Sequence, residues 1–175
     1  MNRFTFVFGG VRSGKSGYAL NMAKSISDDV LYIATSTFED EEMRERIKRH
    51  RDSRPASWGL IEEGLDIAKA LRGADERYKV VLVDCLGIFI SNLLCNNLAE
   101  AEIEERVTRL ARSIREVEAD IIVVSNEVGC GLVPDNPLGR QFRDLVGLAN
   151  QMMSKEADEV VFMQAGIPVT IKGGR

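Results

Sequence analysis

The sequence is poor in the residues that build structural metal sites and disulfide frameworks. Its 175 residues include one histidine and three cysteines, Cys85, Cys95 and Cys130, with no Cys-x-x-Cys pair among them. This shortage argues against a zinc site, and the odd number of cysteines favours reduced thiols over disulfides. The chain also lacks an excess of basic residues, because its formal net charge is -4. Binding to nucleic acid requires such an excess, so we expect no nucleic acid partner and favour a small-molecule substrate.

Long apolar segments are absent as well. The first apolar run, residues 4–8, ends at two glycines and is too short for the apolar region of a signal peptide. No later run approaches the roughly 20 apolar residues that a membrane-spanning helix needs. We therefore expect a cytoplasmic protein with no membrane span. With 45% hydrophobic residues, the chain is long enough for one well-formed core, which predicts a single domain over residues 1–175.

Short apolar runs alternate with longer amphipathic segments along the chain. This alternation predicts an α/β fold, with a mostly parallel sheet and helices on both faces. The expected strands are residues 4–8, 30–34, 79–84, 120–125, 159–164 and 167–172. Only Ala165 and Gly166 separate the last two, so these should form an antiparallel hairpin at the sheet edge. Apolar spacing predicts helices over residues 103–117 and from Pro137 onward.

Residues 9–16 match the phosphate-binding pattern G-x-x-x-x-G-K-[ST] at every position, between an expected strand and an expected helix. In such a P-loop, backbone N–H groups surround nucleotide phosphates at the positive end of the following helix. Lys15 should neutralise the terminal phosphates, and the Ser16 hydroxyl should ligate Mg2+. The predicted nucleotide-binding residues here are Gly9, Gly10, Val11, Arg12, Ser13, Gly14, Lys15 and Ser16. The fold class expected is a single-domain P-loop NTPase with a RecA-like sheet.

Three other residues have two interpretations each. Asp84 ends the apolar run 80–84 and holds Mg2+ through a water, caps the next helix, or does both. Glu127 follows an expected strand and should lie at the carboxyl edge of the sheet, where ligands of such sheets bind. It is either the base for a substrate hydroxyl or a helix-capping or turn residue. Trp58 either stacks on a ligand or belongs to the core.

His50 is the chain's one histidine and lies in a charged segment, residues 39–51, whose spacing predicts a helix. Because Met43 and Ile47 share its face, His50 is either a half-buried packing residue or a functional group. The basic residues around it would lower the pKa of the imidazole and keep it neutral at neutral pH. A neutral imidazole among cations is suited to attack on a phosphorus atom.

Several segments, in this order, resemble the adenosylcobinamide kinase / adenosylcobinamide-phosphate guanylyltransferase family, and the likeness runs from Phe6 to about Lys172. They are residues 9–16, 31–36 (LYIATS), 50–58 (HRDSRPASW), Asp84 with 91–94 (SNLL), and 125–129 (SNEVG) with Pro134 and 140–144 (RQFRD). The resemblance implies that the histidine of the H-[RK]-x-x-R-P segment, here His50, becomes covalently guanylylated. It also implies further residues in the nucleotide site: Ala34, Thr35, Ser36, Arg51, Asp52, Ser53, Arg54, Glu62 and Asp84.

The activity that the resemblance implies has two steps. ATP or GTP phosphorylates adenosylcobinamide, and GMP from GTP then passes through His50 to give adenosylcobinamide-GDP and pyrophosphate. Mg2+ with the nucleotide is the expected cofactor, with Ser16 and Asp84 as its protein ligands; the corrinoid is a substrate, and no tightly bound organic cofactor is expected. The family implies a homotrimer. Two alternatives remain open, a single-activity P-loop kinase in which His50 only packs, and a RecA-like module that uses nucleotide to drive assembly.

Overall fold

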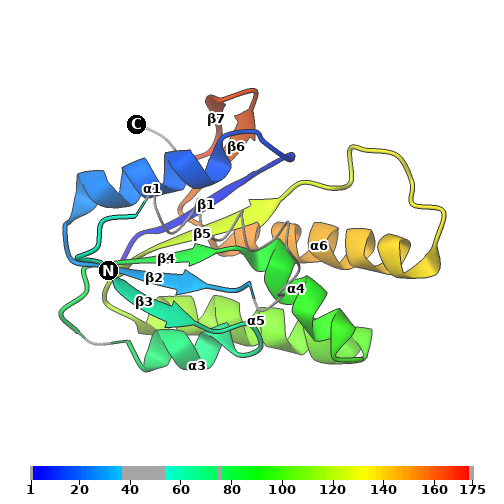
Figure 1. The fold of residues 1–175 in the computed structure, drawn as a ribbon, viewed down its shortest axis with the longest axis horizontal. Coiled ribbons are helices and arrows are strands. Elements are labelled where there is room, and N and C mark those ends of the chain that lie inside the picture. The colour runs from blue at the N-terminus through cyan, green and yellow to red at the C-terminus, as the bar shows by residue number, and fades with distance from the viewer. Residues whose placement is uncertain (1, 37–53, 75, 174–175) are drawn as a thin grey trace.

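The computed structural model describes residues 2–36, 54–74 and 76–173, and all strands in these ranges belong to one sheet (Figure 1). The strands are β1 (Phe4–Gly9), β2 (Val30–Ala34), β3 (Gly59–Glu62), β4 (Val80–Asp84), β5 (Asp120–Asn126), β6 (Glu159–Gln164) and β7 (Ile167–Lys172). Their order across the sheet is β3-β2-β4-β5-β1-β6-β7. The first six strands run parallel, and β7 pairs antiparallel with β6 at the edge.

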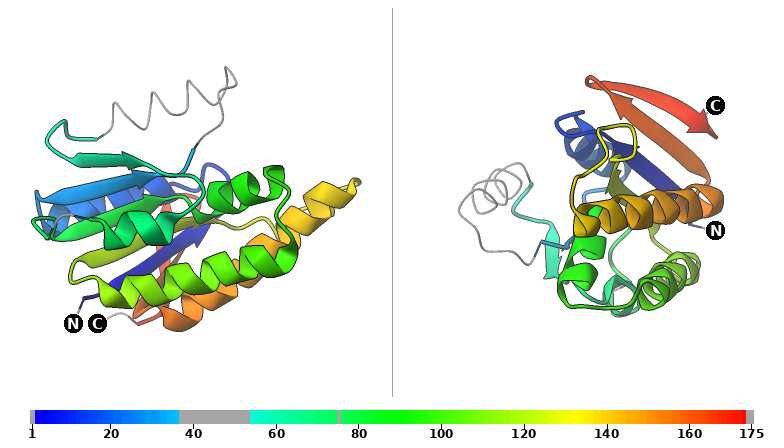
Figure 2. Two further views of the ribbon diagram at one scale, coloured as in Figure 1. Left: turned by 90° about the horizontal axis from the view of Figure 1, so that it is seen from below. Right: turned by 90° about the vertical axis from the view of Figure 1, so that its right-hand side faces the viewer.

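Helices cover both faces of the sheet (Figures 1 and 2). The described helices are α1 (Lys15–Ile26), α3 (Ile67–Arg72), α4 (Leu86–Cys95), α5 (Glu100–Glu116) and α6 (Pro137–Glu156). Helix α1 packs on β1, β4 and β5, whereas α4 packs on β5 and α6 on β1 from the opposite side. Helices α3 and α5 contact each other, and α5 contacts α6, which completes the second layer. Within the described residues, no helix is both long and apolar enough to cross a membrane.

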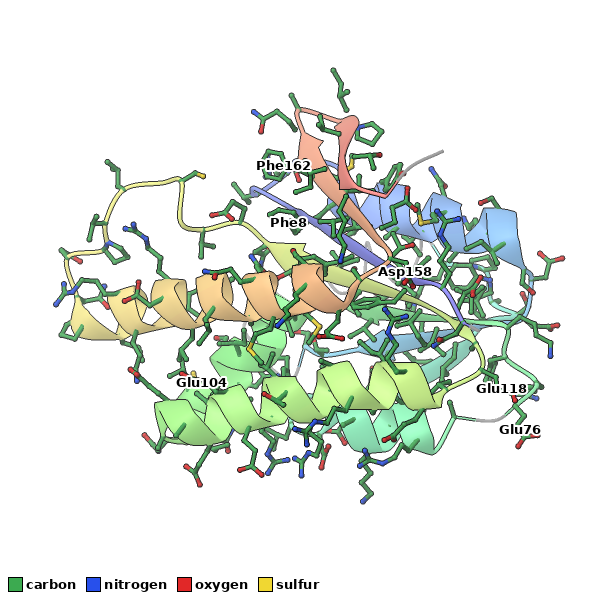
Figure 3. The ribbon with its side chains drawn as sticks, turned by 180° about the vertical axis from the view of Figure 1, so that it is seen from behind. Phe8, Glu76, Glu104, Glu118, Asp158 and Phe162 are labelled. Atoms are coloured by element: carbon green, nitrogen blue, oxygen red, sulfur yellow. The ribbon has the colours of Figure 1, made fainter. Side chains whose placement is uncertain are left out.

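Two apolar cores form because alternate residues of the central strands point to opposite faces. In β4, Val81 and Val83 face the layer of α3 to α6, while Val80 and Leu82 face α1. Strands covered on both faces have continuous apolar sequences, which is why these strands could be predicted from the sequence. On β1 and β6, Phe8 and Phe162 are register partners, with ring centroids 5.2 Å apart (Figure 3).

The predicted fold class, a mostly parallel α/β sheet with a terminal antiparallel hairpin, is confirmed. The hairpin turn has φ of 51° at Ala165 and 83° at Gly166, the positive values that a tight two-residue turn requires. Strand β3 and helices α3 and α4 were not predicted. The helix predicted over residues 39–51 lies outside the described residues.

Candidate nucleotide-binding site

The P-loop lies between the end of β1 and the start of α1, as the pattern predicts. Gly14 is the N-cap of α1 and has a φ of 91°, a conformation that glycine adopts without strain. The first turn of α1 carries no acidic side chain, and its cap makes no side-chain hydrogen bond. The free N–H groups of that turn lie at the positive end of the helix and are therefore available to bind an anion. The Lys15 ammonium donates to the Gly10 carbonyl oxygen at 3.2 Å, so this cation lies over the loop.

Neighbouring strands hold the loop closely. A Cβ at Gly9 would lie 2.5 Å from the Met163 carbonyl oxygen of β6, so no side chain fits there. The Glu127 N–H donates to the Gly9 carbonyl oxygen at 2.9 Å, and the Gly166 N–H donates to the Ser13 carbonyl oxygen at 3.0 Å. The ends of β5 and of the β6–β7 turn thus support the loop. The Ser13 hydroxyl oxygen is buried and has no hydrogen-bond partner among the described residues.

Asp84 ends β4, beside Ala34 at the end of β2. Its carboxylate Oδ2 accepts a hydrogen bond of 3.0 Å from the Tyr32 hydroxyl. Helix α4 takes Cys85 as its N-cap, so Asp84 does not occupy the capping position that the second interpretation required. In the described part of the chain, no group of three or more His, Cys, Asp or Glu residues could hold a metal ion. The oxygen donors of Ser16 and Asp84 nevertheless suit Mg2+, because Mg2+ prefers few protein ligands together with nucleotide phosphates and waters.

Thr35 is fully buried and makes its side-chain contacts with backbone. Its hydroxyl donates to the Cys85 carbonyl oxygen at 2.9 Å and accepts from the Cys85 N–H at 2.7 Å. The Asn92 side-chain amide donates to the Thr35 carbonyl oxygen at 2.7 Å and to that of Gly64 at 3.0 Å. Thr35 therefore joins the end of β2 to the start of α4. The neighbouring Ser36 hydroxyl is also buried and has no partner among the described residues, and Ala34 is half-buried.

Among the residues predicted for the guanylylation segment, Arg54 is described, and His50, Arg51, Asp52 and Ser53 lie outside the described residues. The guanidinium carbon of Arg54 lies 4.4 Å from the centroid of the Tyr32 ring, a cation–π contact. The Arg54 Nε is buried and has no hydrogen-bond partner among the described residues. Glu62 ends β3 and is exposed, opposite Ala34 in the strand register.

Tyr32 was not predicted as a site residue, although the structure brings it together with Asp84 and Arg54. The sequence feature that could have identified it is a tyrosine inside an otherwise aliphatic strand. A buried tyrosine hydroxyl needs a hydrogen-bond partner, so a polar group is expected nearby. Burial and the adjacent Asp84 raise the pKa of Tyr32, so its hydroxyl stays a donor. Burial also raises the pKa of the Cys85 thiol to about 12, with Asp84 adding to the shift. Cys85 therefore remains a thiol at neutral pH and is not a nucleophile.

The other ambiguous residues have structural roles here. The Glu127 carboxylate accepts the N–H groups of Gly129 and Cys130, which is a turn contact. Trp58 is 9% exposed and belongs to the core beneath α1. In α4, a Cβ at Gly87 would lie 2.9 Å from the side-chain nitrogen of Asn126 at the end of β5, so the helix approaches that strand closely there.

Comparison with known proteins identifies relatives that match most of the chain. Residues 5–171 match the family model described as "Cobinamide kinase / cobinamide phosphate guanyltransferase". The chain is 39% identical over 168 residues to the "Bifunctional adenosylcobalamin biosynthesis protein CobP" of Pseudomonas aeruginosa, covering 95% of this chain and 96% of that protein. It is 35% identical over 178 residues to the "Bifunctional adenosylcobalamin biosynthesis protein CobU" of Escherichia coli, covering 95% of this chain and 98% of that protein.

Solved structures share the fold at low sequence identity. The flagellar accessory protein FlaH of Methanocaldococcus jannaschii aligns with a TM-score of 0.55 and 13% identity, covering 98% of this chain and 79% of that one. The RadB recombinase aligns with a TM-score of 0.52 and 16% identity, covering 91% of this chain and 73% of that one. These likenesses concern the RecA-like P-loop fold alone.

Proposed function

The chain belongs to the cobinamide kinase / cobinamide phosphate guanyltransferase family, and from this membership we infer that it is a bifunctional transferase of adenosylcobalamin biosynthesis. It phosphorylates cobinamide and then transfers GMP to the cobinamide phosphate. The observation that carries this conclusion is a family match over residues 5–171 in a chain whose P-loop lies at the carboxyl edge of the sheet. The RecA-like neighbours share only the fold, so they do not favour an assembly function.

For the kinase step, we propose that residues 9–16 bind the triphosphate of ATP or GTP, with Ala34 and Ser36 beside them. Lys15, which contacts the Gly10 carbonyl oxygen in this structure, would exchange that contact for a phosphate oxygen of the transferred group. Ser16 and Asp84 would hold Mg2+, which when bound neutralises charge on the phosphates. Mutual positioning of the triphosphate and the acceptor hydroxyl, together with this charge neutralisation, then supplies the rate enhancement.

For the guanylyl step, we propose that a ring nitrogen of His50 attacks the α-phosphorus of GTP. A P–N bond forms, the bond to the β-phosphate bridging oxygen breaks, and pyrophosphate leaves. A phosphate oxygen of cobinamide phosphate then displaces the imidazole and takes the GMP. Arg51 and Arg54 would offset the charge on the triphosphate. The support for these roles is the H-R-D-S-R-P sequence at residues 50–55, together with the family membership.

Labelling with α-labelled GTP tests the guanylyl step. We expect a covalent protein adduct that is labile in acid and stable in alkali, because P–N bonds to imidazole hydrolyse in acid. The adduct should be absent from His50→Ala, while that variant still phosphorylates adenosylcobinamide. An adduct retained by His50→Ala would refute the role of His50. A wild-type protein that phosphorylates adenosylcobinamide without forming any adduct would favour the single-activity kinase.

We propose that the protein acts in the cytoplasm as a homotrimer, that residues 1–175 act as one domain, and that its partners are ATP, GTP and adenosylcobinamide rather than nucleic acid. No tightly bound organic cofactor is proposed, because the corrinoid is consumed as substrate.

A further inference from the structure

Tyr32 contacts two charged side chains although it lies within a strand of the core. It is 4% exposed and belongs to the apolar cluster beneath α1. Its hydroxyl donates to the Asp84 carboxylate at 3.0 Å, and the Arg54 guanidinium lies 4.4 Å from its ring centroid. One side chain therefore contacts both the acid proposed for Mg2+ and the last cation of the segment that begins at His50.

The sheet order explains how these groups meet. Strand β2 lies between β3, which follows Arg54 in the chain, and β4, which ends at Asp84. In the register, Tyr32 is opposite Leu82, and Ala34 is opposite Asp84. Residues 82 and 84 lie two positions apart on β4 and so point to the same face of the sheet, which is the face of Tyr32.

Each contact has a distinct physical consequence. A hydroxyl that donates to a carboxylate makes a charge-assisted hydrogen bond, which restricts rotation of the carboxylate. An aromatic face holds a guanidinium in one plane without using its N–H donors, which leaves these for other acceptors. The Arg54 Nε accordingly has no hydrogen-bond partner among the described residues.

We propose that Tyr32 is a positioning residue of the nucleotide site: its hydroxyl orients the Asp84 carboxylate for Mg2+, and its ring positions Arg54 for the triphosphate. This inference rests on the proposed function, since it assigns Asp84 and Arg54 to the same nucleotide site. The two halves of Tyr32 act separately, because among the described residues the hydroxyl bonds to Asp84 and the ring face contacts Arg54.

The test is equilibrium binding of a non-hydrolysable GTP analogue, measured by calorimetry in EDTA and over a series of Mg2+ concentrations. Tyr32→Phe keeps the ring and removes the hydroxyl. We expect it to raise the Mg2+ concentration for half-maximal binding enhancement about tenfold, the size typical of lost contacts behind a metal ligand. Its affinity in EDTA should stay within about twofold of wild type, because Arg54 keeps its ring contact.

Tyr32→Leu removes the ring as well. We expect it to weaken metal-free binding to the same extent as Arg54→Ala, and the double variant Tyr32→Leu/Arg54→Ala to be no weaker than either single variant. Such non-additivity is the expected result when two residues act as one unit. Full additivity of the two substitutions would overturn the ring half of the proposal.

Tyr78→Phe is the matched control. Tyr78 has an arginine over its ring too, with the Arg77 guanidinium carbon 4.7 Å from the centroid, and its hydroxyl accepts a hydrogen bond from Arg77. It precedes β4, however, and so lies at the opposite end of that strand from Asp84. We expect Tyr78→Phe to leave the Mg2+ dependence unchanged.

A purely structural role for Tyr32 predicts a different pattern. In that case, Tyr32→Phe would lower the melting temperature and weaken binding equally with and without Mg2+, and the hydroxyl half of the proposal would be overturned. An unchanged Mg2+ dependence would overturn it as well. A wild-type protein that fails to bind the analogue under any condition would instead contradict the proposed function, and the inference would fall with it.

Discussion

At the scale of single residues, polar side chains at the carboxyl edge of the sheet divide into two groups. The hydroxyl of Thr35 and the amide of Asn92 bind backbone groups of other segments. The hydroxyls of Ser13 and Ser36 are buried and have no partner among the described residues. Buried polar groups are seldom left without partners. Ser13 and Ser36 are therefore better suited than Thr35 to contact a bound nucleotide with their side chains.

Asp158 links the start of β1 to α5, and its substitution should make stability depend less on pH. Its carboxylate accepts from Arg115 at 3.0 Å and from the Phe4 N–H at 2.8 Å. Figure 3 labels Asp158. The hydrogen bond from Arg115, and then that from Phe4, lower the pKa of Asp158 below its ordinary value of 3.8. A lowered pKa in the folded state stabilises the fold above the unfolded pKa, and this contribution disappears as pH falls through the folded pKa.

We therefore expect Asp158→Asn to be less stable than wild type at about pH 7, with a difference that narrows as the pH falls below 3.8. Urea denaturation across that range measures the difference. Arg115→Gln should lower the free energy of unfolding less in the Asp158→Asn background than in wild type, because only its bond to the Glu156 carbonyl oxygen is then left to lose. A difference that stays constant down to the lowest pH at which the protein is folded would contradict this explanation.

At the scale of secondary-structure elements, the elements that were predicted from the sequence are those marked by a local pattern of apolar residues. Strands β1, β4 and β5 are covered on both faces and so appear as apolar runs, and the P-loop and Asp84 follow such runs directly. Strand β3 has four residues, of which Leu60 and Glu62 are exposed, so no run marks it. Helix α4 is buried on most sides and therefore lacks a helical apolar period. The meeting of Tyr32, Asp84 and Arg54 depends on sheet order, which local pattern does not contain.

The β6–β7 turn should affect the P-loop as well as the stability of the hairpin. Gly166 has a φ of 83°, and its N–H donates to the Ser13 carbonyl oxygen. Gly166→Val should cost about 1–3 kcal/mol, since a β-branched residue is strained at that φ. Because the strained turn would also shift the residue 166 N–H that supports the loop, nucleotide affinity should fall. Ala165→Gly, which relieves a φ of 51° next to it, serves as the control and should not lower nucleotide affinity.

Urea denaturation and calorimetric titration with the GTP analogue measure the two effects. A Gly166→Val variant that is destabilised but binds the analogue as tightly as wild type would show that the turn contributes to folding only.

At the scale of the whole molecule, two reactions must share one phosphate-binding loop. The chain contains a single G-x-x-x-x-G-K-[ST] segment, residues 9–16. The described strands form one sheet, and this segment follows the carboxyl end of its strand β1. ATP and GTP should therefore compete for that loop. A ligand that binds only the folded state stabilises it by about 2.7 kcal/mol at 100 times its Kd.

Competition makes a quantitative prediction for the two nucleotides together. With non-hydrolysable ATP and GTP analogues each at about 100 times its Kd, a shared site predicts a combined stabilisation of about 3 kcal/mol, whereas two independent sites predict about 5 kcal/mol. Chemical denaturation in the presence of Mg2+ distinguishes these values. Lys15→Ala should reduce the effect of both analogues, because both depend on the same cation. Additive stabilisation would reveal a second nucleotide site and would separate the kinase from the guanylyl transfer in space.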